Sequence, residues 1–110
     1  MTVLTIRAHR RYAVRQPVRL RRDGEKALSG LMIELSSEGI RISNLGRPGL
    51  TIGEEVTVDV EGSKLHGYIR WTHDGIAGVR LAKALFPAQL GELIARGRGE
   101  MAAELALYGT

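Results

Sequence analysis

The sequence contains no cysteine, five aromatic residues among 110, and no long apolar run. Without cysteine the chain has neither a disulfide framework nor a thiolate metal site. Its apolar runs fall well short of the roughly 18 to 20 residues that cross a bilayer, and its N-terminus lacks the apolar core of a signal peptide. These absences favour a cytoplasmic protein that does not insert into a membrane.

Acidic residues are also missing from the first 22 positions, where the chain is strongly basic. The arginines of this segment are Arg7, Arg10, Arg11, Arg15, Arg19, Arg21 and Arg22. A guanidinium binds a phosphate or the edge of guanine through two hydrogen bonds, so we expect an anionic partner. For Arg19, Arg21 and Arg22, solvation of an exposed segment is the better explanation.

The composition is that of one ordinary globular domain, with 44% hydrophobic and 25% charged residues. Apolar and polar residues alternate with the period of two that is typical of strands. This alternation predicts six strands, which begin at Val18 and then cover 28–36, 40–43, 55–60, 65–71 and 76–81. Turn signals every eight to twelve residues indicate an all-β fold, a small six-stranded antiparallel β-barrel that is closed or nearly closed.

Alternation also predicts which side chains face the interior of the barrel. In the second strand we expect Leu31, Ile33 and Leu35 on one face and Met32, Glu34 and Ser36 on the other. Glu34 and Ser36 therefore share the outer face. Trp71 is expected to point inward, and Gly39 either takes a positive φ or lets a ligand approach the backbone.

The pattern after Leu81 changes to helical spacing. Pro87 suits a first helical turn, and apolar residues three and four apart predict a C-terminal α-helix from Pro87 to Arg96. Gly97 and Gly99 are expected to end it. Residues 100–108 form a second amphipathic stretch, with Met101, Leu105 and Tyr108 on one side, which suits packing or weak self-association of an otherwise monomeric chain.

Two short motifs carry the most information about function. Arg10-Arg11-Tyr12-Ala13-Val14-Arg15 is followed by Glu34-Leu35-Ser36-Ser37-Glu38-Gly39. Together they resemble the RxxxR and (D/N)xSxxG motifs of the PilZ domain family, with Glu34 at the position of the family's Asp or Asn. A hairpin with Trp71 and then Gly78-Val79-Arg80-Leu81 is also similar to the last hairpin of PilZ domains. The resemblance covers about residues 10 to 95.

The resemblance implies a split-barrel fold and a noncatalytic receptor for the bacterial second messenger cyclic di-GMP. The ligand-binding residues that it implies are Arg10, Arg11, Arg15, Glu34, Ser36 and Gly39. We divide the chain into a basic arm (1–16), a barrel with its helix (17–96) and an amphipathic tail (97–110). We expect the arm before Gln16 to be loose and to dock across Glu34 and Ser36 when ligand binds, which would signal to an unidentified downstream protein.

Three alternatives follow from the same residues. Glu34 adds a methylene to the acceptor, which can carry the carboxylate past the guanine edge or into an ion pair with Arg15. Such a pair would compete with the ligand and leave a PilZ-like adaptor that binds protein alone. Binding of nucleic acid is disfavoured because few aromatic side chains are predicted to face outward. Catalysis, a cofactor and a metal site are not expected, because His9, His66 and His73 lack ligand-like spacing and no catalytic motif is present.

Overall fold

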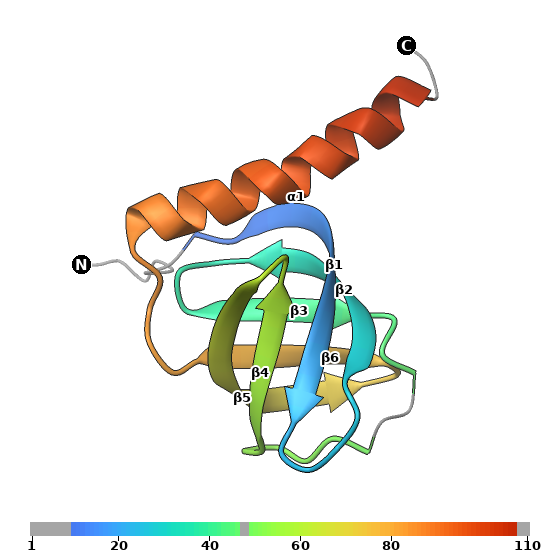
Figure 1. Cartoon of the computed structure of the whole chain (residues 1–110), viewed down its shortest axis with the longest axis vertical. Coiled ribbons are helices and arrows are strands. Elements are labelled where there is room, and N and C mark those ends of the chain that lie inside the picture. Colours follow the sequence, from blue (N-terminus) through green and yellow to red (C-terminus); the bar gives the residue numbers. More distant parts are fainter. Residues whose placement is uncertain (1–9, 47–48, 108–110) are drawn as a thin grey trace, which may run out of the picture.

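The computed structural model describes residues 10–46 and 49–107. Its elements are β1 (Tyr12–Arg22), β2 (Leu28–Leu35), β3 (Gly39–Ser43), β4 (Glu55–Val60), β5 (Ser63–His73), β6 (Ile76–Leu81) and α1 (Pro87–Leu107). The strands are antiparallel and form a closed barrel in the order β1-β2-β3-β6-β5-β4, with α1 across one end (Figure 1). The predicted fold, a six-stranded antiparallel barrel with a C-terminal helix, is confirmed.

Alternating side chains fill the interior of the barrel. The buried apolar residues of the strands are Val14, Val18, Leu20, Met32, Leu35, Ile40, Ile42, Val56, Val58, Val60, Leu65, Ile69, Ala77, Val79 and Leu81. Four of the five connections between successive strands are short, and the exception is the loop 44–54 between β3 and β4. Both residues of the Glu61-Gly62 and Asp74-Gly75 turns have positive φ. Such turns match the twist of two-stranded hairpins, so the turns predicted there are confirmed.

Strand β1 begins six residues before the predicted start at Val18. Tyr12 and Ala13 lie opposite Leu35 and Glu34 of β2, and the pairing continues along the strand to Leu20. The prediction failed because the polar Gln16 and the ring of Pro17 interrupt the apolar pattern, although Gln16 is buried in the structure. The expected loose arm therefore does not extend to Tyr12–Gln16, whereas residues 1–9 of that arm lie outside the described residues.

Two β-bulges overturn two of the predicted faces. An irregularity between Met32 and Glu34 in the β2–β3 pairing places Met32 inside the barrel and leaves Ile33 only partly buried. A second one, between Ile69 and Trp71 in the β5–β6 pairing, turns Trp71 away from the core. A bulge inserts one extra residue and so reverses the alternation beyond it, which a strict period of two does not anticipate.

Helix α1 starts at Pro87 as predicted but runs to Leu107 instead of ending at Gly97. At its start, the side chain of Gln89 accepts a hydrogen bond from the backbone N–H of Phe86 at 3.0 Å. The predicted separate stretch 100–107 is part of this helix, and Tyr108 lies outside the described residues. Neither α1 nor any other described segment forms a helix both long and apolar enough to cross a membrane.

Gly97 lies where α1 approaches β1 most tightly. A Cβ atom at this position would be 2.7 Å from Cβ of Val14 and 3.0 Å from its Cγ1. Gly91 and Gly99, on the same helix, have open space around the equivalent position. Glycine is therefore kept inside this helix by the close contact, and the sequence alone gave the opposite indication of a helix end.

We predict that Gly97→Ala destabilises the protein by about 1 to 3 kcal/mol, because the methyl group meets the rigid branched carbon of Val14. Gly91→Ala and Gly99→Ala are the matched controls and should stabilise it by up to about 1 kcal/mol through helix propensity. Chemical denaturation measures all three. A stabilising Gly97→Ala would contradict the close contact.

Ion pairs join the end of β1 to β4 and to Glu54, the residue before it. Arg22 donates from Nε to Oε2 of Glu54 at 2.7 Å, and Glu54 also accepts from the backbone N–H of Thr51. Arg21 and Lys64 both contact the carboxylate of Asp59. The hydrogen bond from Arg22 lowers the pKa of Glu54, and that from Arg21, followed by Lys64, lowers the pKa of Asp59. Arg21 and Arg22 thus form ion pairs within the fold, whereas from the sequence we expected them only to solvate an exposed segment.

These lowered pKa values predict acid sensitivity. A carboxylate with a lower pKa in the folded state stabilises the fold above its unfolded pKa, and this stabilisation is lost as the pH falls below about 4. The double variant Glu54→Gln/Asp59→Asn should show a flatter decline in unfolding free energy over this acidic range than the wild type, and Asp23→Asn in the exposed β1–β2 turn is the control. Identical slopes in all three proteins would refute the assignment.

Candidate functional site

A row of facing residues crosses four strands on the outside of the barrel. Glu34 of β2 lies opposite Arg41 of β3, which lies opposite Gly78 of β6, which lies opposite Trp71 of β5. Both bulges described above lie beside this row. They turn Glu34 and Trp71 toward the same outer surface, so the departures from regular alternation create the site.

Trp71 and Arg41 form the floor of this surface. A Cβ atom at Gly78 would overlap the indole ring of Trp71, so the ring lies directly across this glycine. The guanidinium of Arg41 is 5.4 Å from the centre of the same ring, within cation–π distance. The indole is therefore held between the strand beneath it and the arginine beside it, and it is half-buried.

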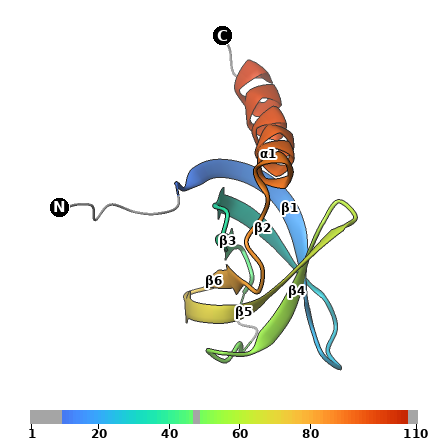
Figure 2. The same ribbon diagram turned by 90° about the vertical axis from the view of Figure 1, so that its left-hand side faces the viewer.

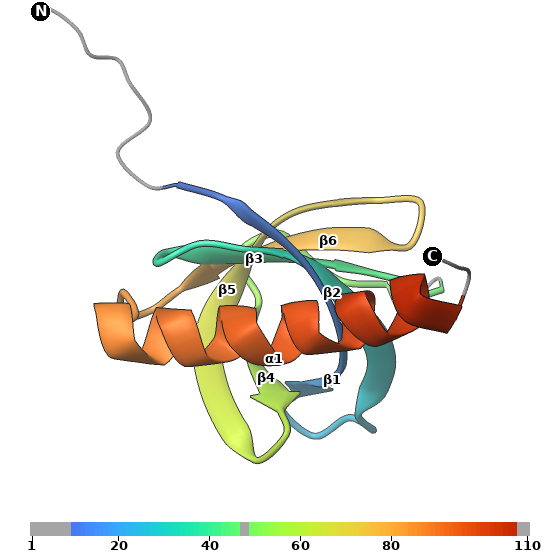
Figure 3. The ribbon, with the colours of Figure 1, turned by 90° about the horizontal axis from the view of Figure 1, so that it is seen from above.

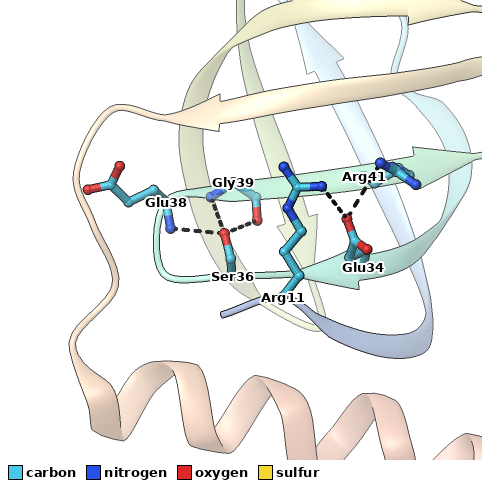
Figure 4. Close-up of polar contacts among 6 residues, drawn as sticks. All are labelled: Arg11, Glu34, Ser36, Glu38, Gly39 and Arg41. Atoms are coloured by element: carbon cyan, nitrogen blue, oxygen red, sulfur yellow. Dashed lines mark hydrogen bonds and ion pairs between the residues drawn. The ribbon is translucent and has the colours of Figure 1, made fainter. Parts of the chain in front are cut away.

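Glu34 lies between two arginines (Figure 4). Its Oε1 atom is 3.9 Å from Nη1 of Arg11 and 3.7 Å from Nη2 of Arg41. Both distances are ion-pair distances too long for hydrogen bonds. The carboxylate partly neutralises the two cations, yet both guanidinium groups keep donors for another anion. Glu34 therefore pairs with Arg11 and Arg41, whereas the partner predicted from the sequence was Arg15.

The turn between β2 and β3 is held by Ser36 (Figure 4). Its Oγ accepts hydrogen bonds from the backbone N–H groups of Gly39 at 3.0 Å and Glu38 at 3.3 Å. The backbone N–H of Ser36 also donates to the carbonyl of Gly39 at 2.9 Å. Gly39 does not have a positive φ; a Cβ there would lie 3.2 Å from the carbonyl oxygen of Val79. The motif residues Ser36 and Gly39 therefore shape this turn against β6.

These elements surround a hollow of about 420 Å³ on the barrel surface. Its lining consists of Arg11, Glu34, Ser36, Glu38, Gly39, Ile40, Arg41, Arg70, Trp71, Gly78, Val79 and Arg80. Four of these residues are arginines and two are glutamates, so the charged lining is net positive. The arrangement suits a ligand that carries both negative charge and a flat ring.

Four of the six predicted site residues line the hollow: Arg11, Glu34, Ser36 and Gly39. Arg10 and Arg15 are exposed and do not belong to the lining. Arg15 is four residues from Arg11 along an extended strand, a separation of about 13 Å. Whether any of the six contacts a ligand stays a prediction.

Sequence reasoning missed the contributions of Arg41, Arg70, Trp71 and Arg80. For the three arginines a signal existed, because each stands at a polar position of an alternating strand and so was expected to face outward. Their convergence depends on strand order, which brings β3, β6 and β5 together. Trp71 gave the wrong signal, because the bulge before it was not visible in the pattern.

Among the described residues, no group of three or more His, Asp or Glu side chains is placed to hold a metal ion. The polar groups of the hollow are instead dominated by cationic donors, which suit an anion.

The chain is thus a small antiparallel barrel whose outer wall carries a cationic hollow with Trp71 as its floor. The sequence profile of the PilZ domain matches residues 5–95. The chain belongs to the PilZ domain family, whose members are cyclic di-GMP receptors, generally noncatalytic, that act through partner proteins. No curated protein matches the chain significantly in sequence.

Solved structures agree with this fold. The crystal structure of the PilZ domain of CeSA from a cellulose-synthesizing bacterium is 19% identical with a TM-score of 0.60, over 84% of this chain and 98% of that one. The Bacillus subtilis inhibitor of motility (MotI/DgrA) is 15% identical with a TM-score of 0.62, over 91% of this chain and 53% of that one. At these identities the likeness is one of fold.

We predict that Ser36→Ala lowers the unfolding free energy by about 1 to 3 kcal/mol, because the partly buried Gly39 N–H loses the hydroxyl that accepts its hydrogen bond. Ser29→Ala, at an exposed position of β2, is the matched control and should change it by less than about 0.5 kcal/mol. Chemical denaturation distinguishes the two. Equal stabilities would mean that the hydroxyl does not hold the turn.

Proposed function

We propose that this chain is a noncatalytic receptor that binds cyclic di-GMP in the hollow around Glu34. The observation that supports this proposal most directly is the convergence of Arg11, Arg41, Arg70 and Arg80 around Trp71. Two of these arginines flank one carboxylate, so donors and an acceptor for a nucleotide stand side by side. Membership of the PilZ family supplies the identity of the nucleotide.

The chemistry of the ligand matches the lining. Cyclic di-GMP carries two phosphodiesters, which accept charge-assisted hydrogen bonds from guanidinium groups, and two guanines, which present an acceptor edge and N–H donors. Arginines of the hollow serve the phosphates and the O6 and N7 edge, and Glu34 accepts from the guanine N–H groups. The half-buried Trp71 ring offers a flat surface for a base, since stacking on an aromatic side chain suits every base.

A few charge-assisted hydrogen bonds are enough for a micromolar affinity. A hydrogen bond to a charged group contributes about 1.5 to 3 kcal/mol, and a micromolar dissociation constant corresponds to about 8 kcal/mol. Three or four such bonds from the hollow are sufficient before the costs of association are subtracted. Breaking the ion pairs of Glu34 with Arg11 and Arg41 is one of these costs in this chain.

Backbone hydrogen bonds connect the hollow to the start of helix α1, and through them a bound ligand can signal to a partner protein. The turn that lines the hollow is hydrogen-bonded to the end of β6 and to the segment that leads to α1. Leu81 N–H donates to the carbonyl of Glu38 at 2.9 Å, and Leu85 N–H donates to that of Ser37 at 2.7 Å. A ligand that displaces the turn would thus move the start of α1. The surface near α1 is where we expect a downstream protein to sense the bound state.

A second candidate function is that of a PilZ adaptor that binds protein but no nucleotide. The position of Glu34 between Arg11 and Arg41 favours it, because an internal anion already occupies the space between two ligand donors. Glu34 has one methylene more than the Asp of the family motif, which lets it reach both arginines.

The test is calorimetric titration of cyclic di-GMP into the wild type, Arg11→Ala, Glu34→Asp and the control Arg19→Ala, an exposed arginine of β1 outside the hollow. We expect micromolar or tighter binding to the wild type and to Arg19→Ala, and at least about tenfold weaker binding to Arg11→Ala through the loss of a charge-assisted bond. Fluorescence of Trp71, the single tryptophan of the chain, should change during the titration.

The variant at position 34 separates the two candidate functions. Binding by Glu34→Asp alone would show a site blocked by the longer carboxylate. No binding by any of the four proteins would leave the adaptor as the better function. Binding that Arg11→Ala leaves unchanged would place the ligand outside this hollow.

A further inference from the structure

One edge of β1 is covered by a helix instead of a strand. β1 pairs with β2 from Tyr12 to Leu20 but with β4 only from Arg19 to Arg22. In its first half, β1 therefore has a strand on one side, and α1 packs along this half (Figures 2 and 3). Unpaired backbone groups at such an edge need another partner.

Arg98 of α1 supplies a partner for one of these backbone groups, and Gly97 before it lets the helix approach the strand. Gly97 brings the helix into contact with Val14, and Arg98 then reaches the strand. Nε of Arg98 donates to the carbonyl oxygen of Ala13 at 3.2 Å, and its guanidinium is 5.6 Å from the centre of the Tyr12 ring. The side chain thus holds two adjacent residues of the strand by a hydrogen bond and a cation–π contact.

The two residues that Arg98 holds stand next to the site. Tyr12 directly follows Arg11, whose guanidinium lies 3.9 Å from Glu34, and Ala13 lies opposite Glu34 across the β1–β2 pair. Arg98 itself is not part of the lining of the hollow. Its contacts are with the two residues that follow Arg11 along the backbone.

We propose that Arg98 is a positioning residue, which clamps Tyr12 and Ala13 and thereby directs Arg11 into the hollow. The effect of Arg98 on cyclic di-GMP affinity rests on the proposed function, but its hold on Tyr12 and Ala13 does not. An Arg11 side chain on a backbone that is not held would sample many directions, and holding it in one reduces the entropy lost on binding. Helix α1 is in this way part of the ligand site without touching the ligand.

The first measurement is amide hydrogen exchange at Tyr12, Ala13 and Val14 in the absence of any nucleotide. Arg98→Ala should accelerate exchange at these residues without lowering the midpoint of global unfolding below that of Arg96→Ala. Arg96 is the matched control: it lies on the same helix and carries the same charge, but its ion pairs are with Glu61 and Glu92. Equal exchange in the two variants would overturn the clamp.

The second measurement is titration with cyclic di-GMP. Arg98→Ala should weaken binding on the order of tenfold, as loss of one charge-assisted contact would, and Arg96→Ala should leave it within about twofold. In an Arg11→Ala background, Arg98→Ala should cause no further loss, because the residue that it positions is gone. An equal loss in both backgrounds, or faster exchange with unchanged affinity, would overturn the positioning role.

The two arms separate this inference from the proposed function. If the wild type does not bind cyclic di-GMP, the proposed function fails, and exchange at Tyr12–Val14 still decides whether Arg98 holds the strand. If the wild type binds and Arg98→Ala behaves as Arg96→Ala does, the inference fails and the proposed function stands.

Discussion

Strand β1 closes the barrel, and the position of the candidate site depends on how it does so. Its second half pairs on both sides, with β2 and with β4, and ion pairs from Arg21 and Arg22 fix that end. Its first half pairs only with β2, and α1 covers the other edge through the contact of Gly97 with Val14. The strand can therefore continue as far as Tyr12, beside the outer wall, where Arg11 meets Glu34. A barrel closed along the whole length of β1 would have no place for this helix.

The two β-bulges bring the charged and aromatic side chains of the site together on the outer wall. The bulges at Ile33 and Arg70 interrupt the alternation that builds the core, and beyond each of them a side chain turns from one face to the other. Glu34 and Trp71 meet on one surface for this reason, with Arg41 between them in the row and Gly78 leaving room for the indole. The apolar core loses little, because Met32 and Ile69 fill the interior beside the bulges.

Much of the fold followed from the sequence because its signals are local. Alternation in Glu55–Val60 and Ile76–Leu81 and the turns at Glu61-Gly62 and Asp74-Gly75 gave strands and hairpins at the observed places. The errors arose where a distant contact overrides a local preference. Gly97 predicts a helix end, yet α1 continues through it, and the close contact with Val14 leaves no room for a side chain there. Gln16 reads as a break in the first strand, yet pairing with Met32 of β2 keeps it in β1.

The sequence by itself determined the class of the protein: an antiparallel barrel, a basic first segment and two motifs, from which Arg11, Glu34, Ser36 and Gly39 line the hollow and Arg10 and Arg15 do not. These properties depend on side-chain period, turn chemistry and residue type, which are written along the chain. Only the tertiary structure decided that Arg41, Arg70 and Arg80 join that site, that Trp71 forms its floor, and that Arg98 reaches the strand which carries Arg11. Strand order and the crossing of α1 bring these residues together over separations of up to 85 positions, and no local pattern encodes such contacts.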